Sequence, residues 1–221
     1  MNYLIHQLLN SEELKILKNN INKEELLWED GKRTAGRHAA KVKNNLQLKR
    51  DSDLSKKFSA LITKKILSNE IIKSFALPKK VHGTIFSKSK NGMKYGRHID
   101  NAYMSSGRAD LSFSIFLNCK DSYSGGSLSI ESFNSEEKFK LKAGEIIIYP
   151  STYLHSVEEV IDGERLVFIG WIETYLKSID VRENLFDLDA AARALLAKYG
   201  RSDEVDLIFK SYSNLLKRLG S

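Results

Sequence analysis

Hydrophobic positions in the N-terminal third recur at helical spacing in two segments. The first covers residues 11–27, where we expect Ser11 to cap a helix with Glu13 in its first turn. The second covers residues 52–74, and its apolar residues fall on one helical face: Leu54, Phe58, Leu61, Ile62, Ile66 and Ile71. An apolar stripe of this kind is typical of a helix that packs on a sheet. The pattern therefore predicts two helices that form a packing layer.

After Pro78 the pattern changes to short runs of β-branched and aromatic residues, separated by Gly, Asn, Asp or Ser. Five such runs are expected to form strands: 81–89, 110–119, 126–133, 138–150 and 163–174. Strands at this spacing, with no helical pattern between them, favour an antiparallel sandwich or barrel. The run "DLSFSIF" alternates strictly, so its serines should face inward if the interior holds a ligand.

Helical patterning returns near the C-terminus. "RENLFDLDAAARALLAKYG" ends at Gly200, a suitable C-cap, and the next segment begins with Ser202 and two acids. We therefore expect a mainly β fold with flanking helices, in which residues 1–178 form the functional domain around a strand core at about 79–175. Residues 179–221 would form a C-terminal helical extension, either covering the core or pairing with a second copy as a homodimer.

Composition narrows the setting. The 221 residues carry a net charge of +7, contain one cysteine, Cys119, and have no apolar run near the roughly 20 residues of a membrane span. Acidic residues come too early for a signal peptide, so we expect a cytoplasmic protein. Residues 31–50 hold seven Lys/Arg and no acid, which suggests contact with an acidic substrate; charge reversal at Lys41 and Lys43 would test this. Nucleic acid is disfavoured, because no aromatic ladder accompanies the charge.

The candidate chemistry begins with His98 and Asp100. Side chains two apart on a strand point the same way, so both can reach one cation, although a surface pair would read the same. His155 follows a turn at Pro150-Ser151 and could equally be a structural histidine. Arg165 lies in a run of apolar residues, where an unpaired charge is costly and a buried anion is expected.

Together these residues fit one known kind of site. Two histidines and one carboxylate form the facial triad of non-haem Fe(II) oxygenases, which leaves three coordination positions open. A chelating 2-oxo acid can occupy two of these positions and O2 the third. The distal carboxylate of the acid then needs a cation, and the planar guanidinium of Arg165 can bind it with two hydrogen bonds.

At this point the sequence resembles the Fe(II)/2-oxoglutarate dioxygenases, and among them the bacterial PKHD-type hydroxylases related to prolyl 4-hydroxylases. The motifs that carry the resemblance are "WEDGKRTAGRHAAKVKNNLQL", "YGRHIDNAYM", "DLSFSIFLN", "YSGGSLSIE", "AGEIIIYPSTYLHSV", "FIGWIET" and "RENLFDLDAAARALL". The resemblance implies a double-stranded β-helix (jelly-roll) core, with Fe(II) bound by His98, Asp100 and His155. It also implies 2-oxoglutarate held by Arg165, O2 as oxidant, ascorbate as reductant, and succinate and CO2 as co-products.

Other residues acquire roles from the same resemblance. The presence of Asp100 points to hydroxylation rather than halogenation, and Tyr95 and Trp171 match aromatic residues that border the cosubstrate in relatives, although both could be plain core. Phe116 stands where some relatives have a tyrosine that helps to bind the distal carboxylate. A second anchor would then be Ser112, Ser114 or another group. His38 and His82 are not expected to touch iron.

The substrate is open at this stage. The resemblance makes a prolyl residue of a peptide or protein the first expectation, and a free amino acid or other small metabolite the second. A catalytically silent jelly-roll that binds a ligand is an alternative, as is a cupin-type enzyme with another metal, although cupin sites usually contain more histidines.

Overall fold

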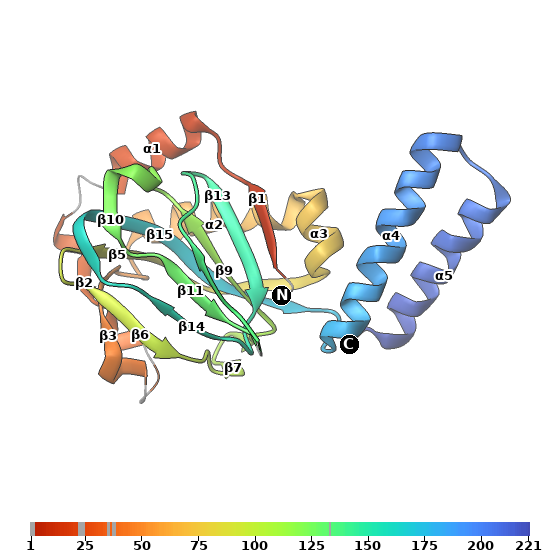
Figure 1. Cartoon of the computed structure of the whole chain (residues 1–221). Coiled ribbons are helices and arrows are strands. Elements are labelled where there is room, and N and C mark those ends of the chain that lie inside the picture. The colour runs from red at the N-terminus through yellow and green to blue at the C-terminus, as the bar shows by residue number, and fades with distance from the viewer. Residues whose placement is uncertain (1–2, 22–24, 35, 37–38, 133) are drawn as a thin grey trace.

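Two antiparallel sheets that face each other form the body of the protein (Figure 1). The computed structural model describes residues 3–21, 25–34, 36, 39–132 and 134–221. The strands of the larger sheet are β1 Leu4–Gln7, β2 Trp28–Asp30, β4 Leu46–Leu48, β5 Pro78–Lys90, β9 Leu111–Phe116, β10 Tyr123–Gly125, β13 Glu145–Pro150 and β15 Val160–Thr174. Those of the smaller sheet are β3 Lys43–Asn44, β6 Lys94–His98, β11 Leu128–Glu131, β12 Glu136–Phe139 and β14 Leu154–Val157. A separate pair joins β7 Tyr103–Met104 to β8 Gly107–Arg108.

The strand order shows how the sheets form a jelly-roll. The larger sheet runs β1-β13-β9-β15-β5-β4-β2, with β10 beside β15, and the smaller runs β12-β11-β14-β6-β3. Neighbours in the sheets are mostly distant in sequence, and the chain passes repeatedly from one sheet to the other. The predicted jelly-roll core is confirmed, as a double sheet rather than a closed barrel.

Alternation along β9 separates two hydrophobic cores. Phe113 and Ile115 belong to the core between the larger sheet and the helices, together with Phe86 and Phe168 of β5 and β15. Phe116 instead belongs to the core between the two sheets. Because side chains alternate along a strand, Ser112 and Ser114 share the inner side with Phe116, as the sequence predicts.

The first helix, α1 Ser11–Ile21, is capped one residue earlier than expected. The N-cap is Asn10 rather than Ser11: its Oδ1 accepts from the Glu13 backbone N–H at 2.9 Å, and Glu13 Oε2 accepts from the Asn10 N–H at 2.8 Å. The helix is also shorter than predicted, because it ends at Ile21 and residues 25–27 form a 3-10 turn. Further 3-10 turns are Gly31–Thr34, Ala39–Val42 and Lys120–Ser122.

The segment predicted as one helix at 52–74 is two helices, α2 Asp53–Ser68 and α3 Glu70–Ala76. Asn69 breaks the helix with an extended backbone, and its side chain accepts from the Ile72 N–H at 3.0 Å. The break changes which side faces inward, so the prediction for Ile71 is wrong: it is 46% exposed and Ile72 is buried instead. Leu61 is also wrongly predicted, at 54% exposed. The helices do pack on the larger sheet, as expected.

The C-terminal hairpin consists of α4 Ile179–Tyr199 and α5 Asp203–Leu219, which project away from the sheets (Figure 1). Helix α4 begins earlier than expected, after the N-cap Ser178, and ends at Gly200 as predicted. Ser202 caps α5 by accepting from the Val205 N–H at 3.3 Å. A small core that includes Leu77, Leu176 and Leu185 joins the hairpin to the rest. No described helix is both long and apolar enough to cross a membrane.

Candidate active site

The two histidines of the predicted triad lie opposite each other on neighbouring strands. His98 is the last residue of β6, and the antiparallel register pairs it with His155 of β14. Their ring centroids are 4.2 Å apart. The Nδ1 atom of His98 lies 2.8 Å from the Gly96 carbonyl oxygen, and that of His155 lies 3.0 Å from the Tyr153 carbonyl oxygen. With Nδ1 turned to a carbonyl, each ring directs its Nε2 to the centre, the arrangement that suits a metal ligand.

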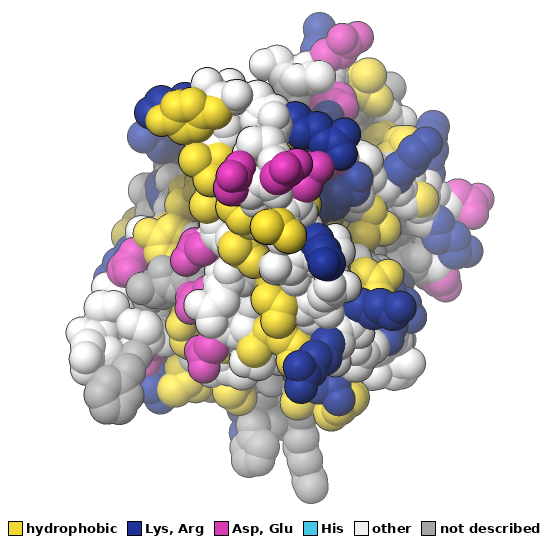
Figure 2. All heavy atoms as spheres, turned by 90° about the vertical axis from the view of Figure 1, so that its right-hand side faces the viewer, with side chains coloured by type: hydrophobic (Ala, Val, Ile, Leu, Met, Phe, Trp, Pro, Cys, Tyr) yellow, Lys and Arg dark blue, Asp and Glu magenta, His cyan; other side chains and the backbone are white. Residues whose placement is uncertain are grey.

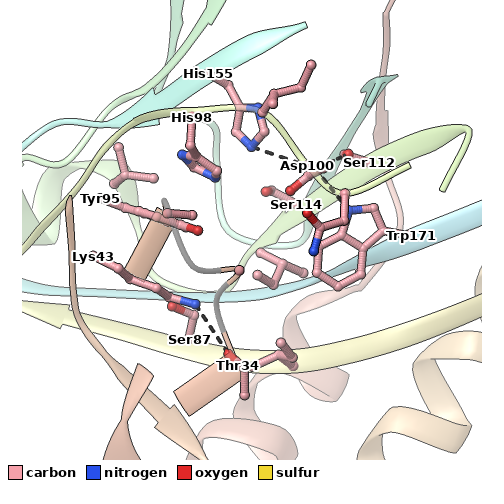
Figure 3. A pocket seen from close by; sticks show the side chains of 18 of the residues that line it. Thr34, Lys43, Ser87, Tyr95, His98, Asp100, Ser112, Ser114, His155 and Trp171 are labelled. Atoms are coloured by element: carbon pink, nitrogen blue, oxygen red, sulfur yellow. Dashed lines mark hydrogen bonds and ion pairs between the residues drawn. The ribbon is translucent and has the colours of Figure 1, made fainter. Parts of the chain in front are cut away.

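Asp100 completes the group from a different place than expected. It lies beyond the end of β6, in the segment that follows, rather than on a continuous strand with His98. Two neighbours hold its Oδ2 atom: Ser112 Oγ donates at 2.6 Å and Trp171 Nε1 donates at 2.9 Å. The indole and the hydroxyl fix the direction of the carboxylate, whose Oδ2 lies 3.8 Å from His155 Nε2 (Figure 3).

The three side chains meet the geometric requirement for one ion. One donor atom from each of His98, Asp100 and His155 lies within 4.8 Å of the others. Burial and the neighbouring His155 lower the pKa of His98 to about 4, so its imidazole is neutral at pH 7, the form that binds metals. A set of two nitrogens and one oxygen on one side, facing open space, fits Fe(II) with positions left for other ligands.

Arg165 is buried without a carboxylate partner in the described part of the chain. It is 3% exposed, and its Nε has no hydrogen-bond partner among those residues. Its guanidinium carbon lies 5.3 Å from the ring centroid of Phe116, and its surroundings include the hydroxyls of Tyr123 and Tyr149. Burial lowers its pKa from the usual value. A buried guanidinium without an anion is costly, so this position fits a bound carboxylate such as the distal one of 2-oxoglutarate.

One cavity of about 700 Å³ contains all of these groups. Its described lining includes every residue that the sequence analysis assigned to the site: Tyr95, His98, Asp100, Ser112, Ser114, His155, Arg165 and Trp171. Tyr95 stacks on His98 with ring centroids 3.7 Å apart. The ring of Phe116 lies against the Arg165 guanidinium.

Some interpretations change with this geometry. The hydroxyl of Ser112, a candidate second anchor, is engaged with Asp100, and Trp171 contacts the same carboxylate. His82 is hydrogen-bonded to Ser106 and to the Arg108 carbonyl and does not line the cavity. His38 lies outside the described residues.

Sequence reasoning missed Tyr149, which lies between the two halves of the site. It is fully buried, its ring centroid is 5.5 Å from that of His155, and the charges of Asp100 and Arg165 both act on it. The alternation of "EIIIYP" could have found it, because Tyr149 shares the inner side of β13 with Ile147. Burial raises the pKa of Tyr149, so its hydroxyl keeps its proton and can donate.

Comparison with known proteins agrees with this chemistry. Residues 84–173 match the family model of the 2OG-Fe(II) oxygenase superfamily. Among curated proteins, PKHD-type hydroxylases of Prochlorococcus marinus strains MIT 9215 and MIT 9312 are 71% and 68% identical to the chain, each covering 100% of both sequences.

Solved structures support the fold. A prolyl-4-hydroxylase of Pseudomonas putida is 17% identical, with a TM-score of 0.57 over 78% of this chain and 92% of that one. A Trichoplax adhaerens prolyl hydroxylase, solved with a hypoxia-inducible-factor peptide, is 15% identical, with a TM-score of 0.57 over 77% and 83%. The full-length identity to curated relatives, joined to the superfamily match over the strand core, shows that this chain belongs to the PKHD-type hydroxylases of the 2OG-Fe(II) oxygenase superfamily.

Proposed function

We propose that His98, Asp100 and His155 bind Fe(II), that Arg165 binds the distal carboxylate of 2-oxoglutarate, and that the enzyme hydroxylates an unactivated C–H bond of a prolyl substrate. The observation that carries this assignment is the combination in one cavity of a three-donor cluster with a buried arginine that has no carboxylate partner among the described residues. Neither feature alone would be specific. Together they match the two ends of a chelating 2-oxo diacid.

The residues around the site orient the metal ligands and bind the cosubstrate. Fe(II) bound there, with 2-oxoglutarate and O2, would supply the oxidation that converts C–H to C–OH, with succinate and CO2 as co-products. Ser112 and Trp171 hold Asp100 in one orientation, while the Gly96 and Tyr153 carbonyls fix the two imidazoles. Arg165 sets the position of the cosubstrate tail, and Tyr149 is in place to donate a hydrogen bond to the same molecule.

A prolyl residue of a peptide or protein is the substrate we propose first. The support is family membership and the shared fold with proteins named as prolyl hydroxylases. A free amino acid or another small metabolite is the alternative, and the cavity could hold either. A silent binding protein fits less well, since it needs neither the cluster nor the buried arginine.

The first test is anaerobic addition of Fe(II) and 2-oxoglutarate, followed by the weak visible charge-transfer band of the chelate. We expect the band in the wild type and in His6→Ala, whose histidine lies outside the cavity, but not in His155→Ala. A wild-type protein that binds no iron and gives no band would overturn the assignment. With the band present, succinate release then identifies substrates from a panel of prolyl peptides and free amino acids.

Three further points belong to the same proposal. Ascorbate would return oxidised iron to Fe(II), and the single free thiol, Cys119, is compatible with a reducing cytoplasm.

We also propose a homodimer through the C-terminal helices. Apolar side chains lie between charged ones on this side of the molecule (Figure 2). The leucines at least 38% exposed on the two helices are Leu195, Leu196, Leu207, Leu215 and Leu219.

A further inference from the structure

Two cations of the basic segment line the cavity without an ion-pair partner among the described residues. Lys43 is 4% exposed, and its Nζ lies 3.3 Å from Thr34 Oγ1 and 4.9 Å from the ring centroid of Tyr95. Arg50 is exposed at the cavity mouth, where Nη2 donates to the Gly83 carbonyl at 3.1 Å. Asp30 and Asp100 act on Lys43 only at longer range than an ion pair. Burying an ammonium without a contacting anion is costly, and an anion bound beside Lys43 would offset this cost.

The position of Lys43 follows from the register of the smaller sheet. Lys43 of β3 pairs with Tyr95 of β6, so the two side chains leave the sheet side by side. Tyr95 in turn stacks on His98. In Figure 3 the ammonium of Lys43, with Thr34 and Ser87, lies across the pocket from His155 and Asp100. A molecule placed between these two walls would meet the metal cluster on one side and the ammonium on the other.

A charge balance shows that the metal and cosubstrate do not account for these cations. If the proposed function holds, the positive charges of Fe(II) and Arg165 together balance the negative charges of the 2-oxoglutarate dianion and Asp100. Asp100 is the only acid in the described lining, and Arg97 is paired with Glu131 at 2.6 Å. The loaded cavity therefore keeps two positive charges, on Lys43 and Arg50. Such a surplus attracts an anion into a low-dielectric site.

We propose that Lys43 and Arg50 form an anion subsite that binds a carboxylate of the substrate near the carbon to be hydroxylated. This inference rests on the proposed function and narrows it. The preferred substrate is a free amino acid, a chain ending in proline, or a prolyl residue beside an acidic side chain, and not an uncharged internal prolyl segment. Lys43 makes the buried contact, and Arg50 draws the anion in from the mouth.

Lys41 provides a matched control within the same segment. It lies two residues from Lys43 but is exposed and does not line the cavity. Of the two lysines named in the acidic-substrate hypothesis, Lys43 thus faces the site and Lys41 does not. Lys43→Met removes the ammonium while keeping an unbranched chain against the Tyr95 ring, and Lys43→Arg keeps the charge.

The experiment measures the binding of three carboxylate and amide pairs to the anaerobic Fe(II)–2-oxoglutarate protein. The pairs are L-proline and L-prolinamide, N-acetyl-glycyl-proline and its amide, and the N-acetylated amides of Glu-Pro and Gln-Pro. Calorimetry and the shift of the charge-transfer band give the affinities. We expect at least one carboxylate member to bind ~10-fold or more tightly than its amide, the scale of a charge-assisted hydrogen bond. The pair that shows the preference identifies the source of the carboxylate.

The variants decide whether the subsite is the cause. The preference should fall toward unity in Lys43→Met, weaken in Arg50→Gln, and persist in Lys43→Arg and Lys41→Gln. A wild type that shows no preference for the carboxylate in any pair overturns the inference while the proposed function stands. A preference that persists in Lys43→Met does the same. Weakened 2-oxoglutarate binding in Lys43→Met, with probe affinities unchanged, also overturns it, because Lys43 would then be a cosubstrate anchor. A wild type without the charge-transfer band overturns the proposed function itself.

Discussion

At the scale of single residues, Lys43 should lower the stability of the metal-free protein. Burial first, and then the charge of Arg50, lower its pKa from 10.5 to about 8. Between these values the unfolded chain binds more protons than the folded one, so this group makes stability rise with pH. Below pH 8 the penalty for the charged form is fully present. We therefore expect Lys43→Met to be more stable than the wild type at pH 7, with the gap shrinking between pH 8 and 10.5.

Chemical denaturation at several pH values measures this difference, and taking wild type minus variant removes the titration of other groups. Lys41→Met is the matched control and should show no such gap. A Lys43→Met protein that is less stable than the wild type at pH 7 would mean that the contacts with Thr34 and Tyr95 outweigh the cost of burial.

A second residue-scale prediction concerns Tyr149. Its buried, protonated hydroxyl lies where the charges of Asp100 and Arg165 both reach it. We expect Tyr149→Phe to weaken 2-oxoglutarate binding by a factor of ~10, the loss of one hydrogen bond to a charged group, with Fe(II) binding unchanged. Titration of the charge-transfer band measures both. Unchanged 2-oxoglutarate affinity, with a loss in Ser114→Ala instead, would make Ser114 the second anchor.

The difference between what was predicted and what was missed at this scale has a physical reason. His98, Asp100, His155 and Arg165 were recognisable because their types and order match one coordination chemistry. Tyr149 carries no such signature in sequence, and the basic segment named Lys43 together with Lys41 without separating the two. Tyr149 reaches the site because β13 turns an alternating side inward, and Lys43 does so because β3 pairs in register with β6. A register between distant segments is not readable from one chain.

At the scale of elements, Asn69 shows how one residue sets two helices. It ends α2 and caps α3, which together had looked like one continuous amphipathic segment. Asn69→Ala should lower the free energy of unfolding by ~1 kcal/mol, the usual cost of losing an N-cap. Chemical denaturation measures this change, and iron binding should be unaffected. Asn214→Ala, on an exposed position within α5, is the control and should not lower stability. Equal stability of both variants would show that packing alone determines the break.

The same scale explains which elements the sequence could predict. Strands β5, β9, β13 and β15 carry long apolar or alternating runs, so their patterns were clear. Strands β1, β2, β3 and β4 have two to four residues, too few for a period, and they exist because a neighbouring strand pairs with them. The end of α4 and the start of α5 were predicted because Gly200 and Ser202 are local signals that do not depend on tertiary packing.

At the scale of the whole molecule, the C-terminal hairpin is attached unevenly. Helix α4 packs against α3, with Phe75 and Phe186 at 5.8 Å and a hydrogen bond of 2.6 Å from Ser74 to Asp189. Helix α5 has a single fully buried residue among its described positions, Val205. The proposed boundary after residue 178 thus places α4 in the extension, although α4 packs on α3 of the domain formed by residues 1–178. A second copy is the partner that the apolar side of α5 would fit best.

The dimer prediction follows from the charge pattern of α5. Its first turn carries Asp203, Glu204 and Asp206, and its last turn carries Lys217 and Arg218. Two copies packed antiparallel about a twofold axis would bring each acidic end against a basic end and cover the leucines between them. We expect the wild type to sediment as a dimer and Leu207→Glu with Leu215→Glu to sediment as a monomer that keeps the charge-transfer band. The exposed Leu61→Glu of α2 is the control and should stay dimeric. A wild type that is monomeric across the concentration range of the experiment would leave α5 as a cover for α4 and nothing more.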